Sequence, residues 1–250
     1  MLALITGASS GIGRDMARIL SEKGYDLILV ARRKTKLQAL KKELNTNVEC
    51  IVMDISTTFN CMELYQEVKD KDIDILINNA GFGLFGEFCE TNLDKELDMI
   101  DLNIKAVHTL TKLFLKDFKK KNKGYILNVA SSAAFLPGPL MATYYSTKAY
   151  VVRLTQSIRQ ELFMKHSKVR ISALCPGPVN TNFNKVADVK FNLAEANSKQ
   201  VAKYAVRKMF ANKILIFPSF TMWLGRLLFK IMPDQLSAFF CYFAQKRKIS

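Results

Sequence analysis

Short apolar runs alternate along the chain with longer segments in which apolar residues recur at helical spacing. Seven runs rich in Ile, Leu and Val predict β-strands at residues 2–6, 26–30, 48–53, 73–77, 125–129, 169–174 and 213–217. Helical spacing predicts helices at residues 11–23, 34–44, 57–69, 92–119, 143–166 and 194–211. Strands that are apolar on both faces are typical of a parallel sheet with helices on both sides. The pattern therefore predicts an α/β fold with a doubly wound, seven-stranded parallel sheet.

Composition fits one full-sized domain and narrows the classes of partner. The chain has 250 residues, 49% of them hydrophobic, which is enough for one large core. Its 37 Lys and Arg residues outnumber its 22 acids, for a net charge of +15. Such a charge suits nucleic acid, an anionic membrane surface or an anionic cofactor. No recognition-helix or base-stacking motif is visible, so we expect no nucleic-acid partner and assign most of the charge to a cofactor.

Cysteine and histidine usage points to a reducing setting without a metal. The five cysteines are odd in number and scattered, with no C-x-x-C pair, which favours free thiols in the cytoplasm over a disulfide framework. His108 and His166 are the only histidines, so no metal site is expected. Met1 leads directly into the first strand, and no signal peptide is expected.

A glycine-rich turn follows the first strand. It reads T-G-A-S-S-G-I-G over residues 6–13, with the glycine spacing G-x-x-x-G-x-G, and a helix follows it. Glycines let the backbone approach a pyrophosphate closely, and the free N–H groups and dipole at a helix start attract anions. Glycine turns are common, but a turn inside the first βαβ unit predicts a dinucleotide phosphate site.

The end of the second strand predicts which dinucleotide binds. An acid at this point would hold the adenosine ribose hydroxyls and select NAD. The chain instead has Ala31, followed by Arg32 and Arg33. Guanidinium groups suit a 2′-phosphate, so we expect NADP(H), the alternative being a solvated basic turn. Arg14, beside the glycine turn, either joins Arg32 at this phosphate or faces solvent.

Tyr144 and Lys148 form the candidate catalytic pair. They are four residues apart, so on the expected helix they lie one turn from each other. A free phenol titrates near pH ~10, and a nearby ammonium is expected to lower the pKa of Tyr144 toward neutrality. Ser131 lies before a loop and could return to bind the atom that the phenol protonates. The alternative is a chance Y-x-x-x-K on an amphipathic helix, which the other motifs of the chain disfavour.

Taken in order, these motifs resemble the short-chain dehydrogenase/reductase family over nearly the whole chain up to about residue 217. Further matches are the D of V-M-D-I, the run N-N-A-G at 78–81, the N of D-L-N-I-K, and C-P-G-P-V-N-T at 175–181. The resemblance implies a single Rossmann-type domain with catalytic roles for Asn103, Ser131, Tyr144 and Lys148. Together with the turn and the arginines, it implies cofactor contacts from Gly7, Ser9, Ser10, Gly11, Ile12, Gly13, Arg32, Arg33, Asp54, Asn79, Ala80, Gly81, Tyr144, Lys148, Pro176, Gly177, Val179 and Thr181.

The function that the resemblance implies is NADP(H)-dependent hydride transfer between nicotinamide and a carbonyl or secondary alcohol. Tyr144 would be the acid/base, Ser131 would stabilise the substrate oxygen, Lys148 would hold the nicotinamide ribose, and Asn103 would connect a proton relay to solvent. We expect a small-molecule carbonyl or alcohol substrate, which the apolar tail favours as lipophilic, a mobile lid at 180–192, and a homodimer or homotetramer. The alternative functions are a catalytically silent nucleotide sensor and a membrane-surface binding protein on the same fold.

The C-terminal extension, residues 218–250, leaves three interpretations open. Residues 214–232 are strongly apolar, but interruptions by Pro218, Gly225, Arg226 and Lys230 make them a poor bilayer span. An i, i+3, i+4, i+7 apolar stripe then precedes the basic residues 246–248; it consists of Leu236, Phe239, Phe240 and Phe243. In the first interpretation this helical extension of the 1–217 domain packs its apolar stripe on the core. In the second it packs over the substrate pocket or against a second subunit. In the third it is a peripheral anchor on anionic lipid.

Overall fold

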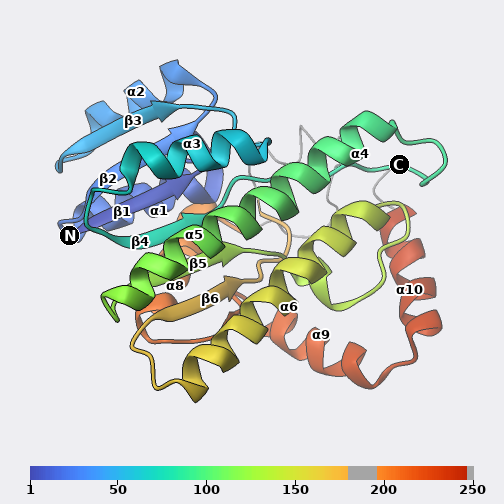
Figure 1. The fold of residues 1–250 in the computed structure, drawn as a ribbon. Helices are drawn as coiled ribbons and strands as arrows, with labels where there is room; N and C mark the ends of the chain where they lie inside the picture. Colours follow the sequence, from blue (N-terminus) through green and yellow to red (C-terminus); the bar gives the residue numbers. More distant parts are fainter. Residues whose placement is uncertain (180–195, 247–250) are drawn as a thin grey trace.

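Seven parallel strands form one sheet in the order β3-β2-β1-β4-β5-β6-β7 (Figure 1). The structure, a computed structural model, describes residues 1–179 and 196–246. The strands are β1 (Leu2–Thr6), β2 (Asp26–Ala31), β3 (Val48–Val52), β4 (Ile73–Asn78), β5 (Tyr125–Val129), β6 (Arg170–Leu174) and β7 (Leu215–Ile216). The predicted fold class is confirmed. The last strand is shorter than predicted, because only its two residues pair with β6.

Helices cover both faces of this sheet and explain its apolar strands (Figure 1). One layer consists of α1 (Gly11–Glu22), α2 (Lys34–Glu43) and α8 (Ser198–Phe210). The other is built mainly from α3 (Thr58–Val68), α5 (Val107–Lys120) and α6 (Ala142–Met164). Ile5 and Leu29 belong to the core under the first layer, whereas Leu4 and Ile28 belong to the core under the second. Neighbouring residues of one strand therefore pack into opposite layers, as the pleat requires.

The predicted helix at 92–119 is interrupted in its middle. It consists of α4 (Leu93–Ile100), a π-helical segment (Asp101–Ala106) and α5. Asn103 lies in the π-helical segment and is fully buried. Because π-helical turns inside α-helices occur often at functional sites, this irregularity marks the region around Asn103.

Buried polar side chains join the strands that carry the site to the helices behind them. Asn78 on β4 donates from Nδ2 to Oδ1 of Asn128 on β5 over 2.9 Å, and Asn128 donates to Oγ1 of Thr155 on α6 over 3.0 Å. Thr111 on α5 joins the same cluster through Asn78. Buried hydrogen bonds of this kind fix the relative position of the elements they join, although Oδ1 of Asn78 has no hydrogen-bond partner among the described residues.

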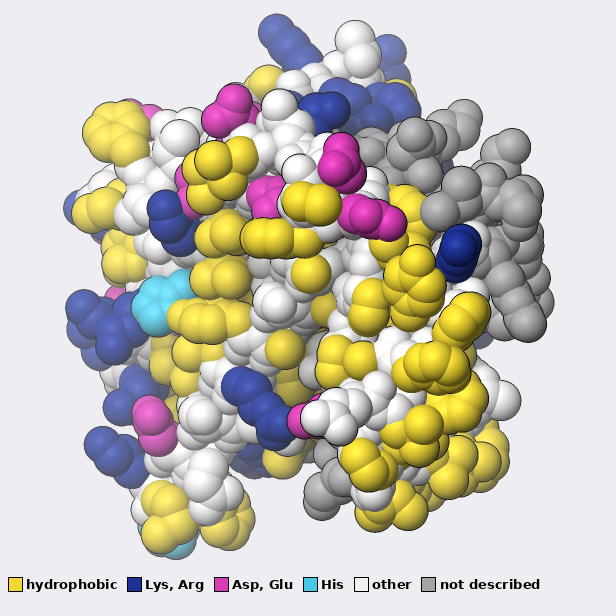
Figure 2. Space-filling view, turned by 90° about the vertical axis from the view of Figure 1, so that its right-hand side faces the viewer, with side chains coloured by type: hydrophobic (Ala, Val, Ile, Leu, Met, Phe, Trp, Pro, Cys, Tyr) yellow, Lys and Arg dark blue, Asp and Glu magenta, His cyan; other side chains and the backbone are white. Residues whose placement is uncertain are grey.

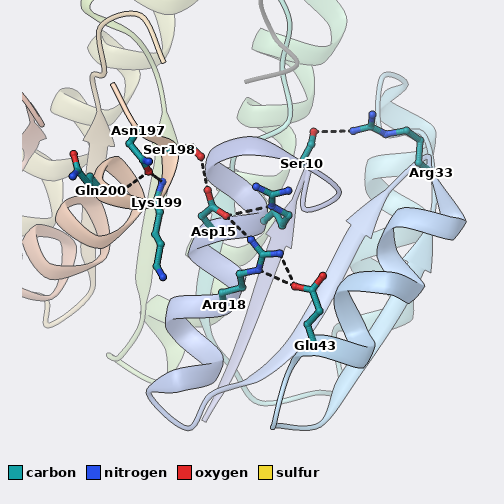
Figure 3. Close-up of polar contacts among 10 residues, drawn as sticks. Ser10, Asp15, Arg18, Arg33, Glu43, Asn197, Ser198, Lys199 and Gln200 are labelled. Carbon is teal, nitrogen blue, oxygen red and sulfur yellow. Dashed lines mark hydrogen bonds and ion pairs between the residues drawn. The ribbon is translucent and has the colours of Figure 1, made fainter. Parts of the chain in front are cut away.

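A polar network also fixes α8, which follows residues 180–195 in the chain, against α1 (Figure 3). Asn197 caps α8 through the backbone N–H groups of residues 199 and 200, and the hydroxyl of Ser198 donates to the buried Asp15 on α1. Arg18 pairs with Asp15 over 3.0 Å and also with Glu43 at the end of α2. The first and last helices of this layer are therefore tied together directly behind the glycine turn.

The chain ends in two helices, α9 (Phe220–Ile231) and α10 (Asp234–Lys246), which lie together at one end of the molecule (Figure 1). The interpretation in which the apolar stripe of 236–243 packs into the core is wrong. Leu236, Phe239, Phe240 and Phe243 are all exposed, and α10 instead buries Ser237, Cys241 and Gln245. No helix in the described ranges is long and apolar enough to cross a membrane.

Candidate active site

A cavity of about 1030 Å³ runs along the carboxyl ends of the strands. Ligands of open α/β sheets bind in this position, where the strand ends meet the helix starts. Seventeen of the predicted site residues line this one cavity: Gly7, Ser9, Ser10, Gly11, Ile12, Arg32, Arg33, Asp54, Asn79, Ala80, Gly81, Ser131, Tyr144, Lys148, Pro176, Gly177 and Val179. Gly13 and Asn103 pack behind its wall, and Thr181, like the predicted lid at 180–192, lies outside the described residues.

The glycine turn has the backbone that a close approach to phosphate requires. Gly7 and Gly11 have φ angles of 64° and 57°, in the left-handed region that glycine adopts without strain. A Cβ atom on Gly13 would lie 2.3 Å from Nδ2 of Asn79, so this position admits no side chain. Asn79 in turn donates to the carbonyl oxygens of Thr6 and Gly7, over 3.0 and 3.1 Å. The end of β4 therefore braces the turn that opens α1.

Two arginines stand at the end of the cavity beside the glycine turn. Arg33 donates from Nη2 to the hydroxyl of Ser10 over 2.8 Å (Figure 3) and to that of Ser9 over 2.8 Å. Arg32 is more exposed and pairs with Asp54 over 3.3 Å. Burial alone would raise the pKa of Asp54, but hydrogen bonds from Ser56 and the Arg32 guanidinium hold it below its ordinary value. Two guanidinium groups and no carboxylate at the end of β2 fit a ribose phosphate better than a free ribose diol.

Arg14 does not join this basic cluster. Its Nε pairs with Oδ1 of the buried Asp15 over 3.2 Å, and its side chain is 40% exposed. Of the two alternatives open from the sequence, the structure favours the partly solvated side chain. Arg14 belongs to the network that joins α1 and α8.

Tyr144, Ser131 and Lys148 meet at the inner part of the cavity. Tyr144 and Lys148 lie on α6, and Ser131 lies between β5 and the short 3-10 helix Ser132–Phe135. The Ser131 hydroxyl hydrogen-bonds the Tyr144 phenol and also accepts from the backbone N–H of Ala133 over 3.1 Å. Lys148 donates to the carbonyl oxygen of Val129 over 3.1 Å, and its Nζ lies 5.8 Å from the centre of the Tyr144 ring. All three side chains are at most 9% exposed.

Burial controls the proton affinities of this group. It raises the pKa of Tyr144 to about 12, opposed by the hydrogen bond with Ser131. It lowers the pKa of Lys148 to about 8. The sequence predicted that Lys148 would lower the pKa of Tyr144, whereas in this protein burial of the phenol raises it. Tyr144 is therefore a protonated phenol at neutral pH, the state that a proton donor requires.

Asn103 connects the π-helical segment to both walls of the site. Its Oδ1 accepts from the backbone N–H of Phe82 over 3.2 Å, and its Nδ2 donates to the Phe82 carbonyl and to Oγ1 of Thr147, over 2.9 and 3.1 Å. A Cβ atom on Gly81 would lie 2.7 Å from Asn103 Oδ1, so this contact needs the glycine. The side chain thus fixes the loop after β4 against α6. Its role in a proton relay stays a prediction.

The C-terminal helices form a wall of the cavity, in agreement with one of the interpretations left open from the sequence, a tail that covers the pocket. Met222 on α9 and four residues of α10 line the cavity: Phe240, Cys241, Ala244 and Gln245. Tyr145, which has no lysine one turn on, also lines it and accepts a hydrogen bond from Gln245. A Cβ atom on Gly177 would lie 3.0 Å from Met222 Sδ, so α9 packs directly on the loop after β6. The spacing of Ser237, Cys241 and Gln245 was the available signal for the inner face of α10.

Comparisons with known proteins identify the family. The short chain dehydrogenase family matches residues 1–190. This chain belongs to that family. A very-long-chain 3-oxoacyl-CoA reductase of Neurospora crassa is 30% identical over 251 aligned residues, covering 96% of this chain and 74% of its own length. An NADP-dependent 3-hydroxy acid dehydrogenase of Salmonella typhi is 34% identical over 190 residues, 74% of this chain and 76% of its own.

A solved structure extends the likeness to the whole fold. The short-chain dehydrogenase from Sphingobium yanoikuyae in complex with NADPH has a TM-score of 0.82 and 28% identity, covering 93% of this chain and 96% of its own. The protein is thus a short-chain dehydrogenase/reductase, an oxidoreductase that acts on alcohol or ketone groups with a nicotinamide cofactor. Among the described residues, no three His, Cys, Asp or Glu side chains gather as metal ligands would.

Proposed function

We propose that the protein is an NADP(H)-dependent oxidoreductase that interconverts a lipophilic carbonyl and its secondary alcohol, with Tyr144 as the acid/base. One observation carries the proposal. The buried group of Tyr144, Ser131 and Lys148 lies in the same cavity as the glycine turn and the arginine pair, so the phosphate end and the proton-transfer end belong to one site. Residues 1–217 would form the catalytic domain, and residues 218–250 an extension packed on it.

The residues present fit a dinucleotide phosphate. The turn leaves no room for side chains at Gly7 and Gly13, and it opens α1, whose free N–H groups favour an anion. Arg33, with Arg32 beside it, would hold the 2′-phosphate that distinguishes NADP from NAD, and Asp54 would meet the adenine. The cofactor, when bound, supplies the hydride.

The proton steps fall to the side chains of the inner group. In the reductive direction Tyr144 would donate its proton to the oxygen that becomes an alkoxide, and Ser131 would stabilise the charge on that oxygen. Lys148, held by the Val129 carbonyl, would keep a positive charge near the phenol, stabilise the phenolate left after the proton is donated, and hold the nicotinamide ribose. Asn103 would hold the walls of the site in register and connect the relay to solvent.

Support for a lipophilic substrate comes from the apolar side chains that line the cavity. They include Leu84, Met141, Met222 and Phe240, the last two contributed by α9 and α10. A very-long-chain acyl substrate in the name of one relative agrees with such a wall, whereas the name of the other gives a 3-hydroxy acid. The apolar lining supports the lipophilic class.

A catalytically silent nucleotide sensor is the second candidate. It is disfavoured because a binding protein has no need of a buried phenol hydrogen-bonded to a serine beside a lysine. We further propose a cytoplasmic setting, consistent with five free thiols, and, from the family resemblance, a homodimer or homotetramer.

Titration with NADPH and NADH, followed by a ketone panel of increasing apolar size, tests the proposal. We expect NADPH to bind at least tenfold more tightly than NADH, and bulky apolar ketones to be reduced with higher kcat/KM than small ones. Equal affinity for both nucleotides would refute the phosphate assignment. Tight binding without turnover of any ketone or alcohol would favour the sensor.

A further inference from the structure

Helix α10 exposes its apolar stripe to solvent and buries the opposite stripe, the reverse of an ordinary surface helix. On α10, Leu236, Phe239, Phe240 and Phe243 lie at i, i+3, i+4 and i+7 and are 45–57% exposed. The opposite stripe, made of Ser237, Cys241 and Gln245, is buried against the body of the protein. A helix on a water-facing surface normally buries its apolar stripe and exposes its polar one.

The neighbouring helix α9 also exposes large apolar side chains. Large apolar side chains recur on α9 at helical spacing and are exposed by 40% or more: Phe220, Trp223, Leu224, Leu227, Leu228 and Ile231. Phe220 and Trp223 stack on each other, with ring centres 5.5 Å apart. Seen from the side of α10, hydrophobic side chains gather over one lower corner of the molecule (Figure 2). We call the exposed apolar side chains of α9 and α10 the tail face; a continuous apolar surface of this kind marks an interaction site.

The charge of the tail favours an anionic lipid surface over a second copy of this chain as the partner of the tail face. Residues 218–250 contain five Lys and Arg residues but one acid, Asp234, and the whole chain carries +15. In a two-fold contact the same face would meet itself, bringing two basic tails together. An anionic lipid surface complements this charge, and aromatic side chains such as Trp223 favour the boundary between headgroups and acyl chains.

The tail face also adjoins the cavity. Phe240 belongs to the exposed stripe of α10 and lines the cavity as well, and Met222 on α9 lines it from the neighbouring helix. A surface covering the tail face would therefore lie next to the apolar end of the site.

We propose that the tail face docks on the surface of an anionic membrane, lying in the headgroup region without spanning the bilayer. The ten exposed apolar side chains would enter the boundary layer, and Lys246 would contact lipid phosphates. This docking does not depend on the oxidoreductase activity or on the choice of cofactor.

Flotation with vesicles tests the docking on the full-length protein. Vesicles of phosphatidylcholine with phosphatidylglycerol are compared with vesicles of phosphatidylcholine alone. We expect the protein to float with the anionic vesicles at least tenfold more than with the neutral ones. A triple variant of the tail face, Trp223→Gln, Phe239→Gln and Phe243→Gln, should lose at least tenfold of that binding, and Lys246→Glu should lose severalfold.

A matched control removes exposed aromatic side chains elsewhere. Phe59 on α3 and Phe163 on α6 are 68% and 67% exposed, so Phe59→Gln with Phe163→Gln makes the same kind of change away from the tail face and should float like the wild type. NADPH binding of every variant shows that it is folded. Failure of the wild type to float with anionic vesicles would overturn the proposal, as would equal flotation of the triple variant.

Analytical ultracentrifugation without vesicles tests whether a second copy of the chain covers the tail face instead. If the triple variant converts an oligomer into a monomer there, a second copy covers the tail face and the membrane proposal is wrong. If its oligomeric state matches that of the wild type while its flotation is lost, the lipid surface is the occupant.

Discussion

Gln245 on α10 donates a hydrogen bond to the hydroxyl of Tyr145, the residue that directly follows Tyr144 on α6. Gln245 is only 2% exposed, and the Tyr145 ring lies so close to Gly138 that a Cβ there would be 2.1 Å from its Cγ. The end of the described chain is thus fastened to the helix that carries the candidate proton donor. This contact makes the C-terminal extension part of the site.

Tyr145→Phe should loosen α10 without stopping hydride transfer. The substitution removes the acceptor of a buried amide donor, which costs about 1–3 kcal/mol. We expect hydrogen exchange of the α10 amides to speed up correspondingly, KM for bulky ketones to rise, and NADPH affinity to stay within about twofold. Exchange measured by mass spectrometry reads the first effect.

Tyr150→Phe is the matched control for that variant. Tyr150 lies on the same helix, and its hydroxyl pairs with Nδ1 of His108 at the surface. Because this pair is exposed, its loss should change stability by less than about 0.5 kcal/mol and leave α10 unaffected. Equal exchange rates in α10 for the two variants would show that the Tyr145 contact does not hold the tail.

Arg33→Ala should weaken NADPH binding selectively. A hydrogen bond to a charged group contributes about 1.5–3 kcal/mol, so we expect the Kd for NADPH to rise about tenfold or more while that for NADH changes by less than about threefold. Arg32→Ala should act in the same direction by a smaller factor, because Arg32 is 73% exposed in its side chain. Fluorescence titration measures both. Equal losses for the two nucleotides would exclude recognition of the 2′-phosphate.

The buried Lys148 should make stability depend on pH. Its pKa in the folded protein is about 8, whereas an unfolded lysine titrates near ~10.4. Between these values the unfolded chain binds the extra proton, so stability rises with pH across this window, and below pH ~8 the folded protein bears the full cost of the buried ammonium.

Lys148→Met should therefore be more stable than the wild type at pH 7, by about 2–3 kcal/mol. The difference should shrink above pH ~8 and vanish above pH ~10.5. Urea unfolding over this pH range measures it, with Lys36→Met, an exposed lysine on α2, as the control. A stability difference that is the same at every pH would contradict the assignment of this cost to the charge of Lys148.

Much of the fold could be predicted because strands such as β1 and β4 are apolar on both faces, and only a covered parallel sheet buries both. The glycine turn and the Tyr144–Lys148 spacing were equally readable, since both are local. The local spacing did not show the π-helical turn at Asn103, whose side chain makes tertiary contacts to Phe82 and Thr147; only the family resemblance pointed to this residue.

The C-terminal extension shows why the rest escaped prediction. Its apolar stripe has ordinary amphipathic spacing, and spacing alone does not say which stripe of a helix is buried. The choice depends on the partners that Cys241 and Gln245 find on Tyr145, a contact across a hundred residues of sequence. The prediction of a lowered pKa for Tyr144 was wrong for a related reason. Burial, which the sequence does not show, raises this pKa.

Single-turnover reduction of a bulky apolar ketone by the NADPH-loaded Tyr144→Phe variant tests most directly whether Tyr144 is the acid/base. Loss of a positioned proton donor slows such a step by about 10²–10⁴-fold. We predict a loss in this range with the Kd for NADPH within about threefold of the wild type, while Tyr145→Phe retains its turnover. Reduction by Tyr144→Phe at the wild-type rate would show that the proton comes from elsewhere.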